Sequence, residues 1–192
     1  MHRTLRVDSG PFTLEASIVD QSESTLIMQY VFKNDSPQNA YLFNKLYKGW
    51  EEQGFYSTGR DIVYVEMDAT QAVVSKKIIP VPPDMEVEKP VIPCVTLVRA
   101  GEKFEETISI NLPLKTWTPY LRSRGAAARE FVAALPLWFE LGFFTTTKEG
   151  DALAKTVRTA DGPALYFYPF SASRQRILRV GPLLDAPVLI QE

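Results

Sequence analysis

FTLEASIVDQSESTLIMQYVFK, residues 12–33, is the stretch of this sequence that decides the fold class. In residues 12–18 every second side chain is apolar, and polar residues lie between them. Side chains two positions apart share one face of a β-strand, so this segment predicts a strand with one buried face. Residues 26–33 alternate in the same way, and the polar residues 20–24 between them predict a turn. Consecutive strands usually pair, so we expect an antiparallel pair here.

The rest of the chain repeats this pattern of short strands and polar turns. The aromatic, Gly-rich segment 48–60 is expected to be a long loop, and the proline-rich strip 80–93 to lie outside the central sheet, because proline cannot donate to a strand ladder. Pro136 is expected to interrupt strand pairing within residues 131–144. The further strands are expected over residues 40–47, 61–67, 72–79, 104–112, 131–144, 153–159, and a last pair over 165–170 and 177–180.

Roughly nine or ten short strands separated by Gly, Pro, Asn and Asp turns predict an all-β fold, an antiparallel immunoglobulin-like β-sandwich. Residues 120–129 are the exception. Their alanines favour one short helix, whereas Gly125 and the aromatic residues beyond favour a loop that enters a strand. No segment has the composition of a linker that would divide the chain into two domains, so residues 1–192 are expected to form a single domain.

Charge and composition argue against several classes of partner. The net charge is −2 and the isoelectric point about 5.6, whereas nucleic-acid binders usually carry a basic excess. No apolar run approaches the length of a membrane span, and no apolar segment follows the first charges of the chain. Cys94 is the only cysteine, so no disulfide can form within the chain. We therefore expect a cytoplasmic protein with no nucleic-acid and no membrane partner.

The inventory of catalytic side chains is small. His2 is the only histidine, so a Ser-His-Asp or Cys-His arrangement lacks a positioned base. One histidine and one cysteine cannot supply a zinc site, and no nucleotide-binding motif occurs. We expect no metal and no cofactor, and the sequence favours a non-catalytic protein.

Two acidic residues interrupt apolar strands. Glu106 breaks the apolar face of residues 104–112, and we expect it to reach water near the strand start. Glu140 lies between Phe139 and Leu141, and simple alternation predicts that it faces solvent. The alternative for Glu140 is a buried acid with a raised pKa.

Candidate binding residues come from two irregular segments rich in aromatic side chains. Exposed rings on such loops can stack on sugars or on the side chains of a partner protein. The alternative is that these rings cover the open ends of the sandwich. A short basic stretch follows the second segment. The candidates are Trp50, Phe55, Tyr56, Trp117, Tyr120, Arg122 and Arg124.

Three functional hypotheses follow, in this order. The first is a non-catalytic interaction or scaffold domain with a protein partner, since strands predominate and catalytic groups are scarce. The second is a carbohydrate or small-ligand binding module that uses the loop aromatics. The third is a hydrolase that works through carboxylates alone, which requires two acids held together in a cleft.

Overall fold

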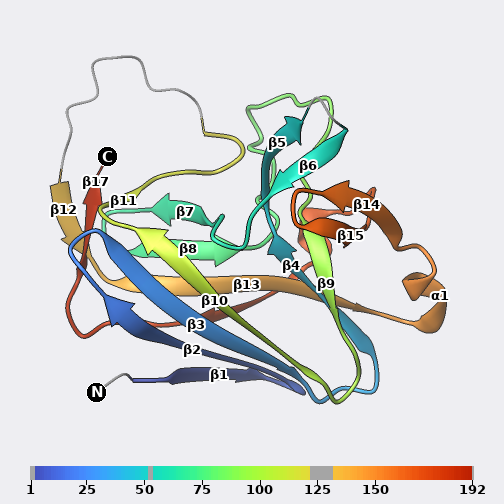
Figure 1. Ribbon diagram of the computed structural model, residues 1–192, viewed down its shortest axis with the longest axis horizontal. Helices are drawn as coiled ribbons and strands as arrows, with labels where there is room; N and C mark the ends of the chain where they lie inside the picture. The colour runs from blue at the N-terminus through green and yellow to red at the C-terminus, as the bar shows by residue number, and fades with distance from the viewer. Residues whose placement is uncertain (1–2, 52–53, 122–131, 192) are drawn as a thin grey trace.

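A computed structural model describes the whole chain except residues 1–2, 52–53, 122–131 and 192 (Figure 1). Strands make up 56% of the chain and helices 4%, which confirms the predicted β class. The described elements are β1 (Leu5–Ser9), β2 (Phe12–Gln21), β3 (Thr25–Asn34), β4 (Asn39–Lys45), β5 (Tyr47–Glu51), β6 (Phe55–Thr58), β7 (Tyr64–Met67), β8 (Ala72–Lys76), β9 (Cys94–Val98), β10 (Lys103–Asn111), β11 (Leu114–Lys115), β12 (Val132–Leu135), β13 (Leu137–Thr146), α1 (Lys148–Asp151), β14 (Lys155–Thr159), β15 (Gly162–Tyr166), the short 3-10 helix η1 (Ala172–Arg174), β16 (Arg176–Val180) and β17 (Val188–Gln191).

The stretch 12–33 forms the β2–β3 hairpin at the centre of what we call the first sheet. Its strand order is β1-β2-β3-β10, and all of its pairs are antiparallel. Ala16 lies opposite Tyr30 in the hairpin, as the two alternating patterns predict. Every second residue of β3 is buried, from Leu26 to Asn34. The predicted antiparallel pair is therefore confirmed.

The second sheet has the order β9-β4-β13-β8-β7, and β16 also pairs with β13. It bends into a half-barrel, so that the whole is a curled multi-sheet fold. It continues through β9 into β15, β14, β6 and β5. The expectation of a purely antiparallel fold is wrong, because β13 pairs with β8 in parallel, as β14 does with β6 and β11 with β17.

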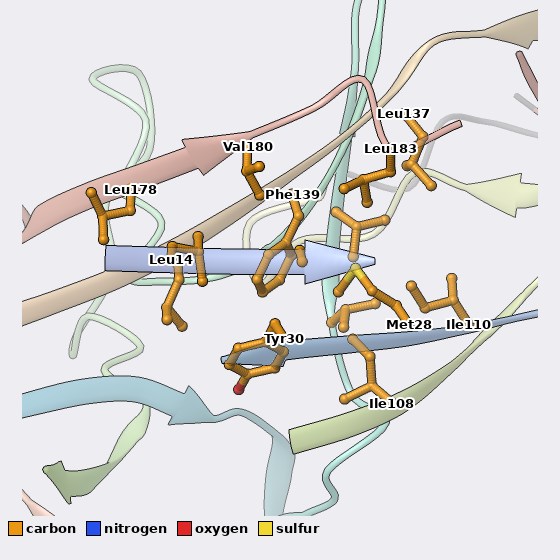
Figure 2. Close-up of a cluster of buried hydrophobic side chains, with 14 of the residues drawn as sticks. Leu14, Met28, Tyr30, Ile108, Ile110, Leu137, Phe139, Leu178, Val180 and Leu183 are labelled. Atoms are coloured by element: carbon orange, nitrogen blue, oxygen red, sulfur yellow. The ribbon is translucent and has the colours of Figure 1, made fainter. Parts of the chain in front are cut away.

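The inner faces of these two sheets pack together and form the main core. The ring of Tyr30 on β3 lies 5.0 Å from that of Phe139 on β13, and Phe12 lies 4.9 Å from Phe143. Each large apolar side chain enclosed in this way stabilises the fold by about 1.5–3 kcal/mol. Figure 2 shows Leu14, Met28, Tyr30, Ile108 and Ile110 of the first sheet pointing toward Leu137, Phe139, Leu178, Val180 and Leu183.

The second sheet also buries its other face. Tyr41 and Phe144 stack at 5.2 Å there, and Phe167 meets the Phe144 ring edge-on. Cys94 belongs to the same cluster and is fully buried, and burial raises the pKa of its thiol to about 12. A sheet with two buried faces explains the many aromatic residues in this chain.

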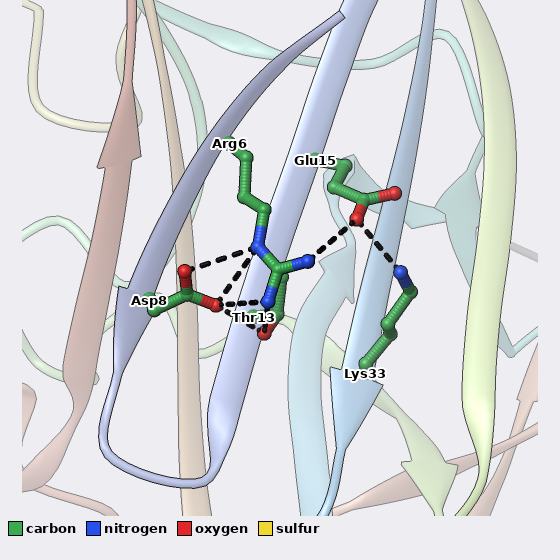
Figure 3. A network of polar contacts seen from close by, with 5 residues as sticks. All are labelled: Arg6, Asp8, Thr13, Glu15 and Lys33. Atoms are coloured by element: carbon green, nitrogen blue, oxygen red, sulfur yellow. Dashed lines mark hydrogen bonds and ion pairs between the residues drawn. The ribbon is translucent and has the colours of Figure 1, made fainter.

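The outer face of the first sheet is polar and solvated. Lys33 lies 2.7 Å from Glu15, and Arg6 lies 2.8 Å from Asp8 (Figure 3). The hydrogen bond from Arg6 lowers the pKa of the Asp8 carboxyl. Exposed pairs of this kind contribute little to stability.

Several expected elements differ from the observed ones. The prediction that residues 48–60 form a long loop is wrong. This segment contains most of β5 and the whole of β6, and these two short strands pair in antiparallel fashion. The predicted last pair is wrong, since β15 pairs with β14 and β9 while β16 pairs with β13. The interruption at Pro136 and the position of strip 80–93 outside the sheets are confirmed. The choice between helix and loop for residues 120–129 falls almost entirely outside the described residues.

No helix in the described part of the chain is long and apolar enough to cross a membrane.

Candidate functional site

A cleft of about 1420 Å³ opens where β10 leaves the first sheet. Its walls are the β4–β5 junction at 44–48, the β6–β7 connection at 58–63, and the segment 109–115 that leads from β10 into β11. Trp117 closes one side. The cleft therefore gathers segments that lie far apart in the sequence.

One wall of the cleft is the outer edge of β10. Along an antiparallel strand, backbone groups point alternately toward and away from the neighbouring strand. The N–H of Leu112 donates to the Ser24 carbonyl at 2.8 Å, on the side of β3. The N–H of Ser109 instead donates to Oδ1 of Asp61 at 2.8 Å, on the cleft side. The odd-numbered residues of this strand thus turn their backbone groups away from β3.

A buried ion pair forms the floor. Nζ of Lys76 lies 2.7 Å from Oε2 of Glu106, and the lysine side chain is completely buried. Nζ also donates to the carbonyls of Arg60 at 2.5 Å and Asn44 at 3.2 Å. The Tyr30 hydroxyl donates to the same Glu106 oxygen at 2.6 Å. The Glu106 side chain keeps 16% exposure at the cleft, so it reaches water as expected, and its carboxylate also neutralises a buried ammonium from the facing sheet.

Burial dominates the electrostatics of this floor. It lowers the pKa of the Lys76 ammonium, and the Glu106 carboxylate acts in the opposite direction. Burial and the same carboxylate both raise the pKa of the Tyr30 hydroxyl. The tyrosine therefore remains a neutral hydrogen-bond donor to Glu106 at ordinary pH.

Two buried polar side chains, Asn44 in the cleft lining and Tyr64 behind Trp117, have unused hydrogen-bonding capacity among the described residues. The Asn44 side chain lies close to the Tyr30 phenol, but neither its nitrogen nor its oxygen has a partner at hydrogen-bond geometry among the described residues. The hydroxyl of Tyr64 is buried without a partner in the same sense. A buried polar group without a hydrogen-bond partner lowers the free energy of unfolding by about 1–3 kcal/mol.

The walls carry lysines that are free of acidic partners within the described residues. They are Lys45, Lys48 and Lys115. The acids of the walls are already engaged, since Asp61 accepts from Ser109 and Asp161 accepts from the Thr58 hydroxyl at 3.1 Å. Neutral donors leave these carboxylates charged, so the walls carry both signs, but none of the carboxylates forms an ion pair with the three lysines among the described residues.

Of the predicted binding residues whose side chains the structure describes, Trp117 is the one that lines this cleft. Its ring lies 5.3 Å from that of Tyr64 and 6.0 Å from Nζ of Lys48, and its backbone bridges to Val65 on β7. The ring is partly exposed. Trp117 therefore offers an apolar surface next to a cation.

The other predicted residues that the structure describes are held by contacts outside the cleft. Tyr56 is buried against Tyr47, at 4.5 Å between ring centroids, and Tyr120 is buried with its hydroxyl accepting from the N–H of Val91. Phe55 lies under the guanidinium of Arg158, at 5.6 Å. The backbone of Trp50 pairs with that of Tyr56 in β5 and β6. Arg122 and Arg124 lie outside the described residues.

Glu140 does not face solvent, so the expectation from simple alternation is wrong. It is 9% exposed, and its carboxylate lies 2.6 Å from Nζ of Lys77 and 3.5 Å from the Arg179 guanidinium. Both faces of this part of β13 are covered, which the alternation of a single strand cannot reveal. The pairing makes Glu140 part of the structural support of the second sheet.

Sequence reasoning missed the lysines of the cleft and the buried Lys76. A signal was present at Glu106, the one acid on an otherwise apolar strand face, and at the two lysines 76–77 within an apolar strand. Among the described residues, no three His, Cys, Asp or Glu side chains are grouped so that they could hold a metal ion. No family model matches the chain, and comparisons with curated proteins and with solved structures also find no match.

Proposed function

We propose that this protein is a non-catalytic interaction domain that binds a protein partner in the cleft beside β10. The observation that carries the proposal is the set of wall lysines at 45, 48 and 115, which line the cleft without acidic partners in the described part of the chain. Glu106 is paired with Lys76, and Asp61 and Asp161 accept hydrogen bonds within the protein without forming an ion pair with these lysines, so an acidic partner would complement the wall lysines.

The size of the cleft supports a protein partner over a small molecule. Sites for small ligands usually measure about 300–1,000 Å³, and this cleft measures about 1420 Å³. Carbohydrate binding would use several exposed rings, and among the candidate rings that the structure describes Trp117 is the one at the cleft. A carboxylate hydrolase would use Glu106 and Asp61, but both are held by contacts within the protein.

The proposal includes the setting of the domain. Residues 1–192 act as one domain, built on an immunoglobulin-like sandwich whose second sheet carries a further layer. Its place of action is the cytoplasm, which the thiol of Cys94 suits, and its partners include neither nucleic acid nor membrane.

The test compares three purified proteins in the selection of random peptides from a display library. They are the wild type, the cleft variant Lys48→Glu/Lys115→Glu, and the control Lys148→Glu/Lys155→Glu, which makes the same change of charge at exposed lysines away from the cleft. We expect the wild type and the control to enrich the same peptides and the cleft variant to lose them. A wild type that enriches no peptide, or three proteins that enrich alike, would overturn the proposal.

A further inference from the structure

We infer that the partner segment is an extended acidic polypeptide that adds as a strand to the open edge of β10, an inference that rests on the interaction function proposed above. Three features of the cleft support it: an unpaired strand edge, an acidic side chain that already caps this edge, and lysines around it.

The open edge follows from the register of β10. Thr107 and Ser109 lie opposite Gln29 and Ile27 of β3, and the contact from Ser109 to Asp61 shows that this set of residues points outward. Thr107 is exposed, and within the described residues its backbone N–H and carbonyl face no neighbouring strand. An unpaired edge is a template for another strand, and extended peptides bind many proteins in this way.

Asp61 occupies a position on this edge that the backbone of an added strand would take. Its carboxylate oxygen accepts the Ser109 N–H at 2.8 Å, which is the role of a carbonyl oxygen in a paired strand. The Asp61 side chain is 48% exposed and lies 3.9 Å from the Arg60 guanidinium, so it can turn toward solvent while a peptide takes its place. The edge is thus protected in the free protein, as edges of stable sheets commonly are.

The lysines determine the charge of the added strand. Lys48 and Lys115 are exposed and Lys45 partly exposed, and all three line the cleft that the edge of β10 borders. Every second side chain of an added strand points to the same face, so acidic residues at alternate positions would meet these ammonium groups. Trp117 beside Lys48 would cover an apolar residue of the same segment.

The test uses one peptide from the library selection, labelled for fluorescence polarisation, and two derivatives in which alternate backbone amides carry N-methyl groups. Strand addition uses every second N–H of the peptide, so one derivative should lose at least about tenfold in affinity and the other should bind nearly as the parent does. Replacing the acidic residues of the peptide by their amides should cost roughly tenfold as well.

A protein variant tests the same edge from the other side. Thr107→Pro removes an N–H that points away from β3, so it should lower peptide affinity while the thermal midpoint stays near that of the wild type. Selected peptides without acidic residues, or two N-methylated derivatives that bind equally, would overturn the strand addition and leave the interaction function standing. A library that yields no peptide would overturn both.

Discussion

The ammonium of Lys76 on β8 and the carboxylate of Glu106 on β10 form an ion pair of 2.7 Å that joins the two sheets beneath the cleft. Two charges in such a place depend on each other, because either one alone would be buried without compensation. The pair therefore fixes the distance between the edge of the first sheet and the second sheet.

Removal of one partner should destabilise the protein strongly. Lys76→Met and Glu106→Gln should each lower the free energy of unfolding by about 3–5 kcal/mol. The double variant should recover most of this loss, because the glutamine still accepts from the Tyr30 hydroxyl and no buried charge is left. Urea denaturation of the four proteins measures the coupling, and strictly additive losses would contradict this account of the pair.

Asn34 should be a second point of high sensitivity. Its side chain is fully buried, donates to the carbonyls of Gln38 at 2.8 Å and Val98 at 3.0 Å, and accepts from the Ser36 hydroxyl at 2.6 Å. Asn34→Ala should lower the free energy of unfolding by about 2–4 kcal/mol, because buried carbonyls lose their donor. Asn39→Ala, which removes one partly exposed hydrogen bond, should cost less than about 1 kcal/mol. Equal losses in the two variants would show that the Asn34 contacts are not decisive.

Strands with one buried face could be predicted from the sequence, because their hydrophobic pattern is local. The alternation in β3 and β10 survives in the structure almost residue by residue, as the exposed Glu105 and Thr107 and the buried Ile108 illustrate. In β2 the apolar face is buried as predicted, but Thr13 and Ser17 on the other face are buried as well. Strands with two covered faces were harder. Alternation predicts that Glu140 on β13 faces solvent, because no local pattern reports Lys77, which follows β8 and covers it.

The candidate site could not be assembled from the sequence for a related reason. Lys76 and Glu106 lie 30 residues apart and meet only because two sheets face each other. The lysines of the walls come from separate segments, and nothing at 45, 48 or 115 marks them as neighbours. Trp117 was found because an aromatic residue in an irregular segment is a local feature.

Gly142 should resist substitution, because β13 changes partner at this residue. Pairing with β8 ends at Leu141 and pairing with β4 begins at Phe143. A Cβ here would lie 2.9 Å from Cα of Lys77 and 2.6 Å from Oε1 of Gln175, which is itself held by two hydrogen bonds to Ile78. Gly142→Ala should lower the free energy of unfolding by about 1–3 kcal/mol.

Gly49 provides the matched control for this crowding. A Cβ at Gly49 would meet no atom within 4 Å. Gly49→Ala should therefore leave the thermal midpoint unchanged or raise it slightly. If the Gly142→Ala protein were as stable as the Gly49→Ala protein, Lys77 and Gln175 would be able to move away from the added Cβ without loss of stability.

The turn at Asp68 predicts a specific pH dependence. Its carboxylate accepts from the hydroxyl and the N–H of Thr70, each at 2.7 Å, and from the side-chain amide of Gln71, and these bonds lower its pKa from 3.8 to about 2. A carboxyl whose pKa is lower in the folded state stabilises the protein above its unfolded pKa and loses this effect as the pH falls through the folded value. The contribution of Asp68 should therefore be complete above about pH 4 and disappear toward about pH 2.

Carbon-13 NMR of the Asp68 carboxyl checks this directly, with an expected midpoint near 2. Asp68→Asn should flatten the dependence of stability on pH in the same acidic range. A midpoint near the ordinary value of 3.8 would mean that the hydrogen bonds of the turn do not persist in solution.

The most direct test of the cleft as the binding site is to map amide shifts by NMR as the selected acidic peptide is added to the isotope-labelled protein. The account predicts that the amides of Thr107 and Ser109 and the indole of Trp117 shift most, with the amide of Asp61 following as its carboxylate leaves the strand edge. Largest shifts on the outer face of the first sheet, around Arg6 and Lys33, would contradict it.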